Sequence, residues 1–483
     1  MDNRLVPRAG AVAACLLVLS VCETAFGGGV FASDRGTRPL GRGGAFVAGA
    51  DDLESIYYNP AGIVHASRQI LADAELMFVS TEFTRSVRVS QADPNTGEPT
   101  GVTFERTYPT SKGSGPKIPI PLLAVSYDFG INGAAFALGA WTPMAAVPQY
   151  DVLVDGKPNP GRYMLLSLKG SALIVPGVWA AYKIIPALSV GAGFEMMLGN
   201  IVSESAMTGC VQDRFLCATE DPDYDFNVRM TVGPVISPSG NIGVQFDPHE
   251  NVRVGLSFQA PFYIHAATTS HGRIPSAALF EKAYQDGDQA WLDMKFPWVA
   301  RSGIELRWPK FKAEASFVYE AWSMHDEASI TPEDIVYRDV TGLSQDYRVS
   351  KKAVPRNFKD TWSVRLGGEG TIKVGSRRLD LRAGALYEPS AIHRSYLSTV
   401  TMDLDKVIAS IGASFHLSDR YRFDVMVAQS FSPETTVSVA EARFELISQV
   451  RANDTDAEFR DYVNAGKYKS SATMLGVGFA ANY

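Results

Sequence analysis

Hydrophobic and polar residues alternate one by one along several stretches of the chain. Residues 252–260, 379–388, 407–417 and 421–427 each place apolar side chains at every second position and polar or small ones between them. A period of two predicts β-strands with one face in an apolar medium and the other in a polar one. A soluble β-sandwich would show the same alternation. The connections between the strands are therefore needed to distinguish a soluble sandwich from a membrane barrel.

Very short turns alternate with long polar loops. Tight turns are expected near residues 128–132, 185–187, 247–251, 308–310, 374–377 and 418–420, and long loops near 90–117, 143–162, 203–224, 269–289, 327–356, 396–403 and 443–467. Bacterial outer-membrane barrels show this exchange, with short periplasmic turns and an even strand number. We therefore predict an all-β fold, a transmembrane antiparallel β-barrel of about fourteen strands over residues 69–483.

The first 27 residues have the three parts of a secretory signal peptide. Arg4 and Arg8 form a basic start, residues 9–21 are apolar, and small residues follow near Ala25 and Gly27. A lipid-attachment site at Cys22 fits less well, because a valine precedes that cysteine. We predict that the chain is exported and that residues 1–27 are removed.

The end of the chain also favours a barrel. Residues 473–483 place apolar side chains on one face and stop at Tyr483, as outer-membrane barrels commonly do. Such an end resembles the signal read by the barrel assembly machinery. Residues 311–322 form a run close to the roughly 9 to 11 residues that a tilted strand needs to cross a bilayer, whereas soluble strands average about 5 to 6.

Composition excludes several other classes. Mean hydropathy is −0.03 although 46% of the residues are hydrophobic, which does not fit a helical membrane protein. A net charge of −7 argues against a nucleic-acid partner, because phosphate binding needs concentrated Lys and Arg. Cys210 and Cys217 remain after export; their spacing matches neither a redox motif nor a zinc site, and we predict a local disulfide. We expect no metal and no cofactor.

A glycine-rich segment, residues 40–62, lies between the signal peptide and the first strand. Asp51 and Asp52 predict a short helical turn, which Asn59 and Pro60 end because proline disfavours helix in the residue before it. The Asn59, Pro60 and Ala61 signature resembles the amino-terminal hatch of the FadL family, outer-membrane transporters of long-chain fatty acids and other hydrophobic compounds.

Short blocks in the same order extend the resemblance across the chain. They are Trp141-Thr142-Pro143, Ala181-Tyr182-Lys183, Val190-Gly191-Ala192-Gly193, Tyr319-Glu320-Ala321-Trp322-Ser323 and Lys359-Asp360-Thr361-Trp362. The resemblance implies a hatch at residues 28–68 inside the barrel, a monomer in the lipid of the Gram-negative outer membrane, and uptake of a hydrophobic cargo by diffusion.

Two candidate sites follow from that resemblance. An apolar groove between outside loops is expected at Val211, Phe215 and Leu216 in the disulfide loop, and at Ala278, Leu279, Phe280 and Tyr284 in an amphipathic helix over residues 276–286. The alternative is that these residues only pack the loops together. Gly139 and Pro143, near the end of the third strand, are candidates for a lateral gap in the wall, because glycine and proline weaken a strand.

Charged residues recur at positions expected to face the lumen. They are Arg253, Glu305, Arg307, Lys312, Glu314, Arg365, Glu369, Arg382, Glu388, Arg422 and Asp424. We interpret most of them as pairs that rigidify the wall and anchor the hatch; one cation could instead hold a fatty carboxylate.

No catalytic motif stands out in the sequence. A diffusion porin or a structural barrel is the main alternative to a transporter of hydrophobic molecules, and an outer-membrane enzyme is the second.

Overall fold

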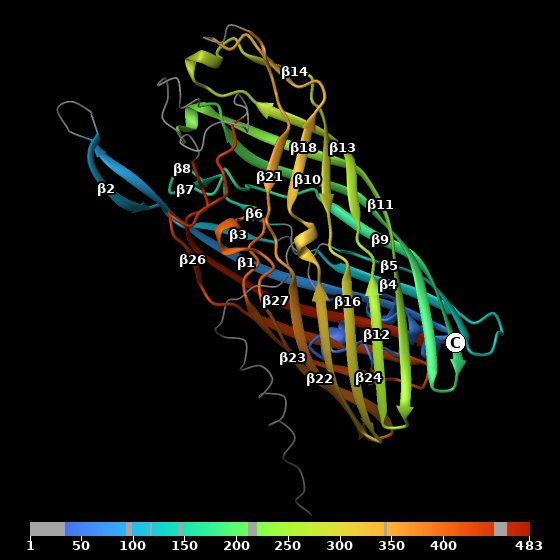
Figure 1. Ribbon diagram of the computed structural model, residues 1–483. Helices are drawn as coiled ribbons and strands as arrows, with labels where there is room; N and C mark the ends of the chain where they lie inside the picture. The colour runs from blue at the N-terminus through green and yellow to red at the C-terminus, as the bar shows by residue number, and fades with distance from the viewer. Residues whose placement is uncertain are drawn as a thin grey trace, which may run out of the picture.

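The computed structural model describes residues 34–92, 99–115, 118–143, 148–210, 220–341, 345–448 and 461–483. Within these residues, long tilted strands close into one antiparallel barrel of fourteen strands, several of them divided into shorter segments. Figure 1 shows the tight turns at one end of the barrel and the long loops at the other. The all-β barrel expected from the alternation is confirmed.

The first half of the wall contains the longest strands. Its strands and those of the adjoining loops are β1 (Gln69–Ala92), β2 (Pro99–Thr107), β3 (Ser111–Ser114), β4 (Ile120–Tyr127), β5 (Ala134–Trp141), β6 (Gln149–Tyr150), β7 (Leu153–Val154), β8 (Lys157–Pro158), β9 (Ala172–Ile185), β10 (Leu188–Thr208), β11 (Asp225–His249), β12 (Val252–Gln259) and β13 (Tyr263–Arg273). The ladder between β10 and β11 runs from Leu188↔Phe246 to Thr208↔Asp225. This part of the wall therefore extends far beyond the others toward the loops.

The second half returns the chain to its start. It comprises β14 (Tyr284–Asp286), β15 (Gln289–Lys295), β16 (Val299–Trp308), β17 (Phe311–Glu320), β18 (Glu327–Pro332), β19 (Val336–Arg338), β20 (Tyr347–Arg348), β21 (Lys352–Pro355), β22 (Thr361–Val374), β23 (Arg377–Glu388), β24 (Lys406–His416), β25 (Tyr421–Phe431), β26 (Thr435–Val437) and β27 (Gly466–Asn482). The last strand pairs with β1, from Gln69↔Asn482 to Arg85↔Gly466, and closes the barrel. The tight turns predicted near residues 308–310, 374–377 and 418–420 join these strands as expected.

The helices of the described residues are all short. They are α1 (Thr37–Leu40), α2 (Ser55–Tyr58), η2 (Pro60–Ala66), η4 (Pro222–Tyr224), η5 (Ala278–Phe280), η6 (Trp322–Met324) and η7 (Arg394–Tyr396). Among the residues described, no helix has the length and apolar character needed to cross a membrane.

Two rows of aromatic side chains lie on the outer face of the wall. The row near the tight turns includes Tyr127, Phe129, Trp308, Phe311 and Tyr421, and the row toward the loops includes Phe258, Trp298, Tyr319, Trp362 and Tyr387. From Phe311 to Tyr319 the chain rises about 26 Å along β17, which is roughly 20 Å along the membrane normal for a strand tilted by about 40°, somewhat less than the apolar band of about 25 Å on outer-membrane barrels. The outer wall therefore has the two interfaces of a membrane-spanning barrel.

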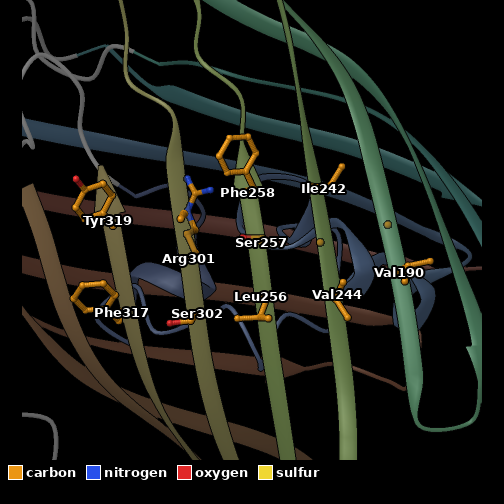
Figure 2. Close-up of a pocket in the computed structure, with 13 residues that line it drawn as sticks. Val190, Ile242, Val244, Leu256, Ser257, Phe258, Arg301, Ser302, Phe317 and Tyr319 are labelled. Atoms are coloured by element: carbon orange, nitrogen blue, oxygen red, sulfur yellow. The ribbon is translucent and has the colours of Figure 1, made fainter. Parts of the chain in front are cut away.

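Aliphatic side chains fill the band between the two rows. Ile304 and Leu366 are 53% and 59% exposed there. Figure 2 shows a shallow groove of about 530 Å³ on the same face, bordered by Leu256, Phe258 and Phe317. Exposed apolar area of this extent fits hydrocarbon rather than water as the surrounding medium.

The long loops beyond β11 and β13 form a small core of their own. The ring of Phe226 packs against the rings of Phe280 and Tyr337, with centroids 5.3 and 4.8 Å apart. The amphipathic helix predicted over residues 276–286 is wrong: only the turn η5 forms, and Tyr284–Asp286 pairs as β14 with β19. Pairing with a distant strand outweighs the local helical pattern, because strand formation depends strongly on tertiary context.

Candidate functional site

The candidate site begins with residues 34–68, which we call the inner segment. This segment lies inside the barrel, in the half nearer the tight turns (Figure 1). Its helix α1 contacts β24, β25 and β27, whereas η2 contacts β5, β9, β10 and β11 on the other side of the wall. The segment therefore spans the lumen from one side to the other.

Glycines on the inner face of the wall receive the backbone of the inner segment. Those whose Cβ position would meet its main-chain atoms are Gly191, Gly255, Gly303, Gly367, Gly384 and Gly412, and a Cβ at Gly243 would meet the side chains of Asn59 and Pro60. Gly191 pairs directly with Gly243, and Gly367 with Gly384, so the close approaches form cross-strand patches. A side chain at Gly367 or Gly384 would overlap the main chain of Arg42. The absence of Cβ at these positions is what lets the two main chains touch.

Asn59 joins the inner segment to the wall through its side-chain amide. Its Nδ2 donates to the carbonyl of Val47 within the segment at 2.9 Å and to the carbonyl of Val244 on β11 at 3.0 Å. Its Oδ1 accepts from the N–H of Ala61 at 3.2 Å and caps the turn η2, whose first residue is Pro60. The Asn59-Pro60-Ala61 signature thus ends α2, starts η2 and contacts the wall within three residues.

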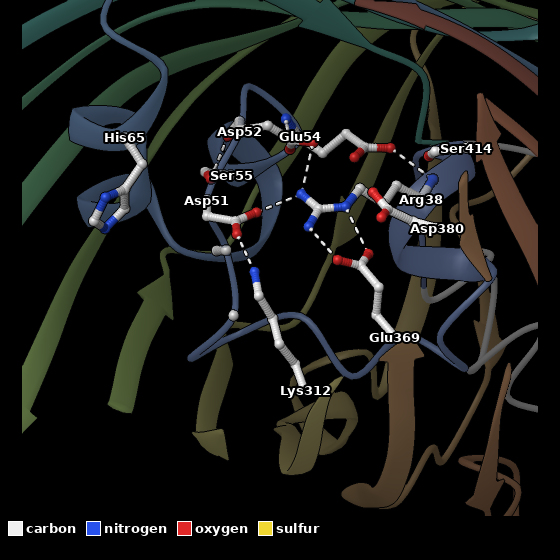
Figure 3. Close-up of polar contacts among 12 residues, drawn as sticks. Arg38, Asp51, Asp52, Glu54, Ser55, His65, Lys312, Glu369, Asp380 and Ser414 are labelled. Atoms are coloured by element: carbon white, nitrogen blue, oxygen red, sulfur yellow. Dashed lines mark hydrogen bonds and ion pairs between the residues drawn. The ribbon is translucent and has the colours of Figure 1, made fainter. Parts of the chain in front are cut away.

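Arg38 is the centre of an ion-pair network between the inner segment and the wall. Figure 3 shows its guanidinium between Asp51 of the segment and Glu369 of β22. It also lies 3.0 Å from Asp52, and Lys312 of β17 donates to Asp51 at 2.9 Å. All these groups are largely buried, so each charge depends on its partners for stabilisation.

Arg42 forms a second link. Its guanidinium lies 2.9 Å from Glu305 of β16 and 3.6 Å from Glu314 of β17. Glu314 also accepts hydrogen bonds from the N–H groups of Val47, Ala48 and Gly49 at 2.7 to 3.0 Å. The predicted role of the inward charges as anchors of the amino-terminal segment is confirmed for these residues.

The sequence did not identify the segment's own arginines as partners. Arg38 and Arg42 pair with residues far along the chain, and Asp34 pairs with Arg365 on β22. The available signal was the recurrence of arginine at positions 35, 38 and 42 in an otherwise glycine-rich stretch. Arginines that recur in this segment, with carboxylates predicted on the inner face of the wall, indicate that ion pairs form. They do not indicate which residues pair.

Three carboxylates hold the start of α1. The N–H groups of Gly36, Thr37 and Arg38 donate to Glu75, Asp73 and Glu54 at 2.8, 3.1 and 2.9 Å. Glu54 and Asp73 lie side by side, and each keeps a buried oxygen that no donor of the described residues reaches. Burial, together with the charges of Asp52 and Asp73, raises the pKa of Glu54 well above its usual value, while Arg422 opposes the rise. One proton shared between the two side chains would satisfy both oxygens.

We expect the docking of the inner segment to weaken as pH rises, because docked Glu54 keeps a proton that an undocked, water-exposed Glu54 loses above its ordinary pKa of about 4.3. The contribution is at most roughly 1.4 kcal/mol per pH unit. Glu54→Gln stays neutral at every pH and should reduce this dependence. Hydrogen exchange of the Gly36 and Thr37 amides, compared between pH 6 and pH 9, measures it. Equal pH dependence in wild type and variant would contradict the assignment.

A separate cavity of about 170 Å³ lies inside the barrel toward the loops, and we call it the upper cavity. Its walls are mainly apolar and include Met164, Met207, Met230, Met294 and Phe296. Several strands contribute, among them β10, β11, β13, β15 and β18. Methionines suit a pocket for varied apolar ligands, because their unbranched side chains adapt their shape.

The charged lining of the upper cavity is one-sided. Lys352 and Arg356 line it, together with His325, and no aspartate or glutamate is among the described lining residues. Burial lowers the pKa of His325 to about 4, with the nearby Arg356 adding to the shift, so the imidazole is neutral near pH 7. Burial also lowers the pKa of Arg356 to about 10.

The predicted groove residues lie elsewhere. Phe280 is 2% exposed in the loop core, Tyr284 is 48% exposed on β14, and neither they nor Ala278 and Leu279 line the upper cavity. Val211, Phe215 and Leu216 lie outside the described residues. Cys210 is disulfide-bonded, and its predicted partner, Cys217, also lies outside them.

Gly139 and Pro143 lie beside the inner segment. Gly139 is regularly paired within β5, and its Cβ position would lie 2.9 Å from the Ile56 side chain. The ladder between β5 and β9 ends at Trp141↔Val175. Just beyond it, the Arg35 guanidinium donates to the carbonyls of Thr142 and Pro143 at 2.6 Å each.

Solved structures of similar shape share little sequence with this chain. A FadL homologue of Pseudomonas aeruginosa is 15% identical with a TM-score of 0.63, covering 94% of this chain and 99% of that one. The toluene transporter TodX of P. putida is 12% identical with a TM-score of 0.59, covering 92% and 99%. The monoaromatic hydrocarbon channel CymD is 15% identical with a TM-score of 0.54, covering 93% and 97%. These similarities show the fold.

The family is shown by the sequence itself. No curated protein matches the chain. A family model described as "Outer membrane protein transport protein (OMPP1/FadL/TodX)" matches residues 18–483. The chain therefore belongs to this family of transport proteins, and it is a multi-strand barrel of the Gram-negative outer membrane.

Proposed function

We propose that this protein takes up long-chain fatty acids or similar hydrophobic molecules across the outer membrane by diffusion. The observation that carries the proposal is an apolar cavity inside a barrel whose lumen is spanned, below it, by the inner segment. Exposing an alkyl chain to water costs about 0.8 kcal/mol per CH₂. An apolar cavity avoids this cost because it keeps the alkyl chain of the cargo out of water during passage. A diffusion porin would instead need an open, polar lumen.

The cargo is expected to pass from the loops into the upper cavity and then past the inner segment, which acts as a movable hatch. Exit through the wall is proposed at the end of β5. There the ladder to β9 ends, and the Arg35 side chain rather than a neighbouring strand binds the carbonyls of Thr142 and Pro143. Movement of the hatch would remove Arg35 and leave this edge of the wall open.

Asn59→Ala tests the hatch. The variant loses the amide hydrogen bonds to Val47 and Val244, each worth about 1 kcal/mol, and we expect a changed rate of uptake in cells with unchanged binding to purified protein. Binding is measured by titrating detergent-purified protein with labelled oleate and with toluene. Gln429→Ala, which alters a hydrogen bond between β25 and β27 away from the inner segment, is the control.

The two measurements separate the two parts of the proposal. If neither ligand binds the wild type at micromolar concentration, the cargo assignment fails. If cells take up the ligand equally with wild type and Asn59→Ala, the inner segment is not the hatch.

A further inference from the structure

Positive charge gathers on one part of the barrel's tight-turn end. The turns near residues 308–310, 374–377 and 418–420 lie close together there, because β17 pairs with β22 and β23 pairs with β24 (Figure 1). These turns and the strand ends beside them carry five exposed cations, which we call the basic rim: Lys310, Lys373, Arg377, Arg378 and Arg420.

The basic rim has few counter-charges. Among the described residues, Arg378 alone of the five forms an ion pair, with Asp380 at 2.8 Å. Lys373 lies directly opposite Arg378 across the ladder between β22 and β23, and like charges in that position repel each other. Asp419 is the single carboxylate in the sequence of the three turns. An anion bound from outside would relieve this repulsion.

The other charged turns have the opposite character. The turns near residues 128–132 and 247–251 carry Asp128, Asp247 and Glu250. Asp128 pairs with Arg68 and Asp247 pairs with Arg253, each at 2.8 Å. The excess of positive charge therefore belongs to one part of the tight-turn end and not to the whole of it.

The basic rim borders the apolar outer wall. Trp308, Val374 and Leu417 lie in or next to the same turns, and each is at least 50% exposed. The Arg377 guanidinium donates to the carbonyl of Leu417 at 3.3 Å, which links two of the turns. Short turns of outer-membrane barrels lie on the periplasmic side, so the cations are level with the head groups of the inner leaflet. A lipid would meet both the cations and the apolar side chains, whereas a soluble acidic partner would meet only the cations.

We propose that the basic rim binds the phosphate groups of anionic phospholipids in the inner leaflet of the outer membrane. Clusters of about four to eight Lys and Arg beside a membrane are typical of surfaces that bind anionic lipid. Each guanidinium offers a fork that matches two phosphate oxygens. This surface is distinct from the upper cavity and from the contacts of the inner segment, and it does not depend on which cargo is carried.

The test compares dioleoyl phosphatidylglycerol with dioleoyl phosphatidylcholine, which share their chains and differ in net charge. A cation at a membrane surface contributes about fivefold in affinity for anionic lipid. By native mass spectrometry of detergent-purified protein, we expect the wild type to bind phosphatidylglycerol at least about tenfold more tightly. The preference should shrink as ionic strength rises. A triple variant with Lys310→Gln, Arg377→Gln and Arg420→Gln should lose it.

A matched triple variant removes the same charge near the long loops. Its three arginines, each replaced by glutamine, pair with carboxylates away from the tight turns, and it should keep the preference of the wild type. They are Arg229, Arg338 and Arg394. Heat-dependent gel mobility reports that each barrel is folded.

Three outcomes would overturn the proposal. They are equal affinity of the wild type for the two lipids, an unchanged preference in the folded rim variant, and an equal loss of preference in the loop variant. Glycerol 3-phosphate carries the phosphate without the chains and should not displace phosphatidylglycerol at equal concentration; displacement would identify a site for soluble phosphate instead of lipid. Binding of toluene should be the same in wild type and rim variant, so each of these failures leaves the proposed function standing.

Discussion

Gly367→Leu is expected to raise the ion conductance of the folded barrel several-fold, because the inner segment cannot seat against a side chain at this position. The Cβ position of Gly367 overlaps the carbonyl of Arg42. That carbonyl cannot shift freely, since the Arg42 side chain is bound by Glu305 and Glu314. Single-channel recording in planar bilayers measures the result.

The same strand supplies the control. Gly370 faces outward, and its Cβ position has only ordinary contacts with Phe311 and Lys310 at 3.8 and 3.9 Å. Gly370→Leu adds the same volume to β22 without touching the inner segment, and it should conduct like the wild type. A folded Gly367→Leu barrel with wild-type conductance would show that the segment tolerates a side chain beneath it.

Arg38→Met is expected to undock the inner segment, because Arg38 pairs with three carboxylates. The substitution leaves Asp51, Asp52 and Glu369 without their shared cation. Breaking a buried pair from one side typically costs about 3–5 kcal/mol. We expect protease cleavage within residues 34–68 at a protease concentration that leaves the wild type intact.

Arg68→Met is the matched control for this measurement. Arg68 pairs with Asp128 at 2.8 Å, but its side chain is 44% exposed, and such pairs contribute roughly 1 kcal/mol or less. Its cleavage pattern should resemble that of the wild type. Resistance of Arg38→Met equal to that of Arg68→Met would mean that the remaining cations, Lys312 and Arg422, suffice to hold the segment.

The wall was predictable because its signals are local. Alternation along residues 407–417 follows from the strand geometry alone, and the turn between Trp308 and Phe311 lies where the tight turn was expected. The inward carboxylates Glu305 and Glu314 were found for the same reason. Their partner Arg42 was not, since the pairing spans 263 residues and depends on how the segment enters the barrel.

The upper cavity could not be predicted from the sequence. Arg356 lies in a connection that shows no periodicity, and its neighbour in space, Asp326, belongs to a different connection. The apolar pattern at residues 276–286 predicted a helix, whereas Tyr284–Asp286 pairs with a strand 50 to 54 residues further along the chain. Loop geometry of this kind is set by tertiary contacts, which a single sequence does not display.

The closure of the wall by β1 and β27 dictates an order of events in biogenesis. Gln69 meets Asn482, so the first strand has no neighbour on one side until nearly the entire polypeptide has been delivered. Until then the edge of β1 is open to pairing with another chain, and such remote contacts are slow to form. The arginines and glutamates that later hold the inner segment must therefore form their ion pairs while the sheet is still incomplete. A chaperoned, stepwise assembly suits this topology better than spontaneous collapse.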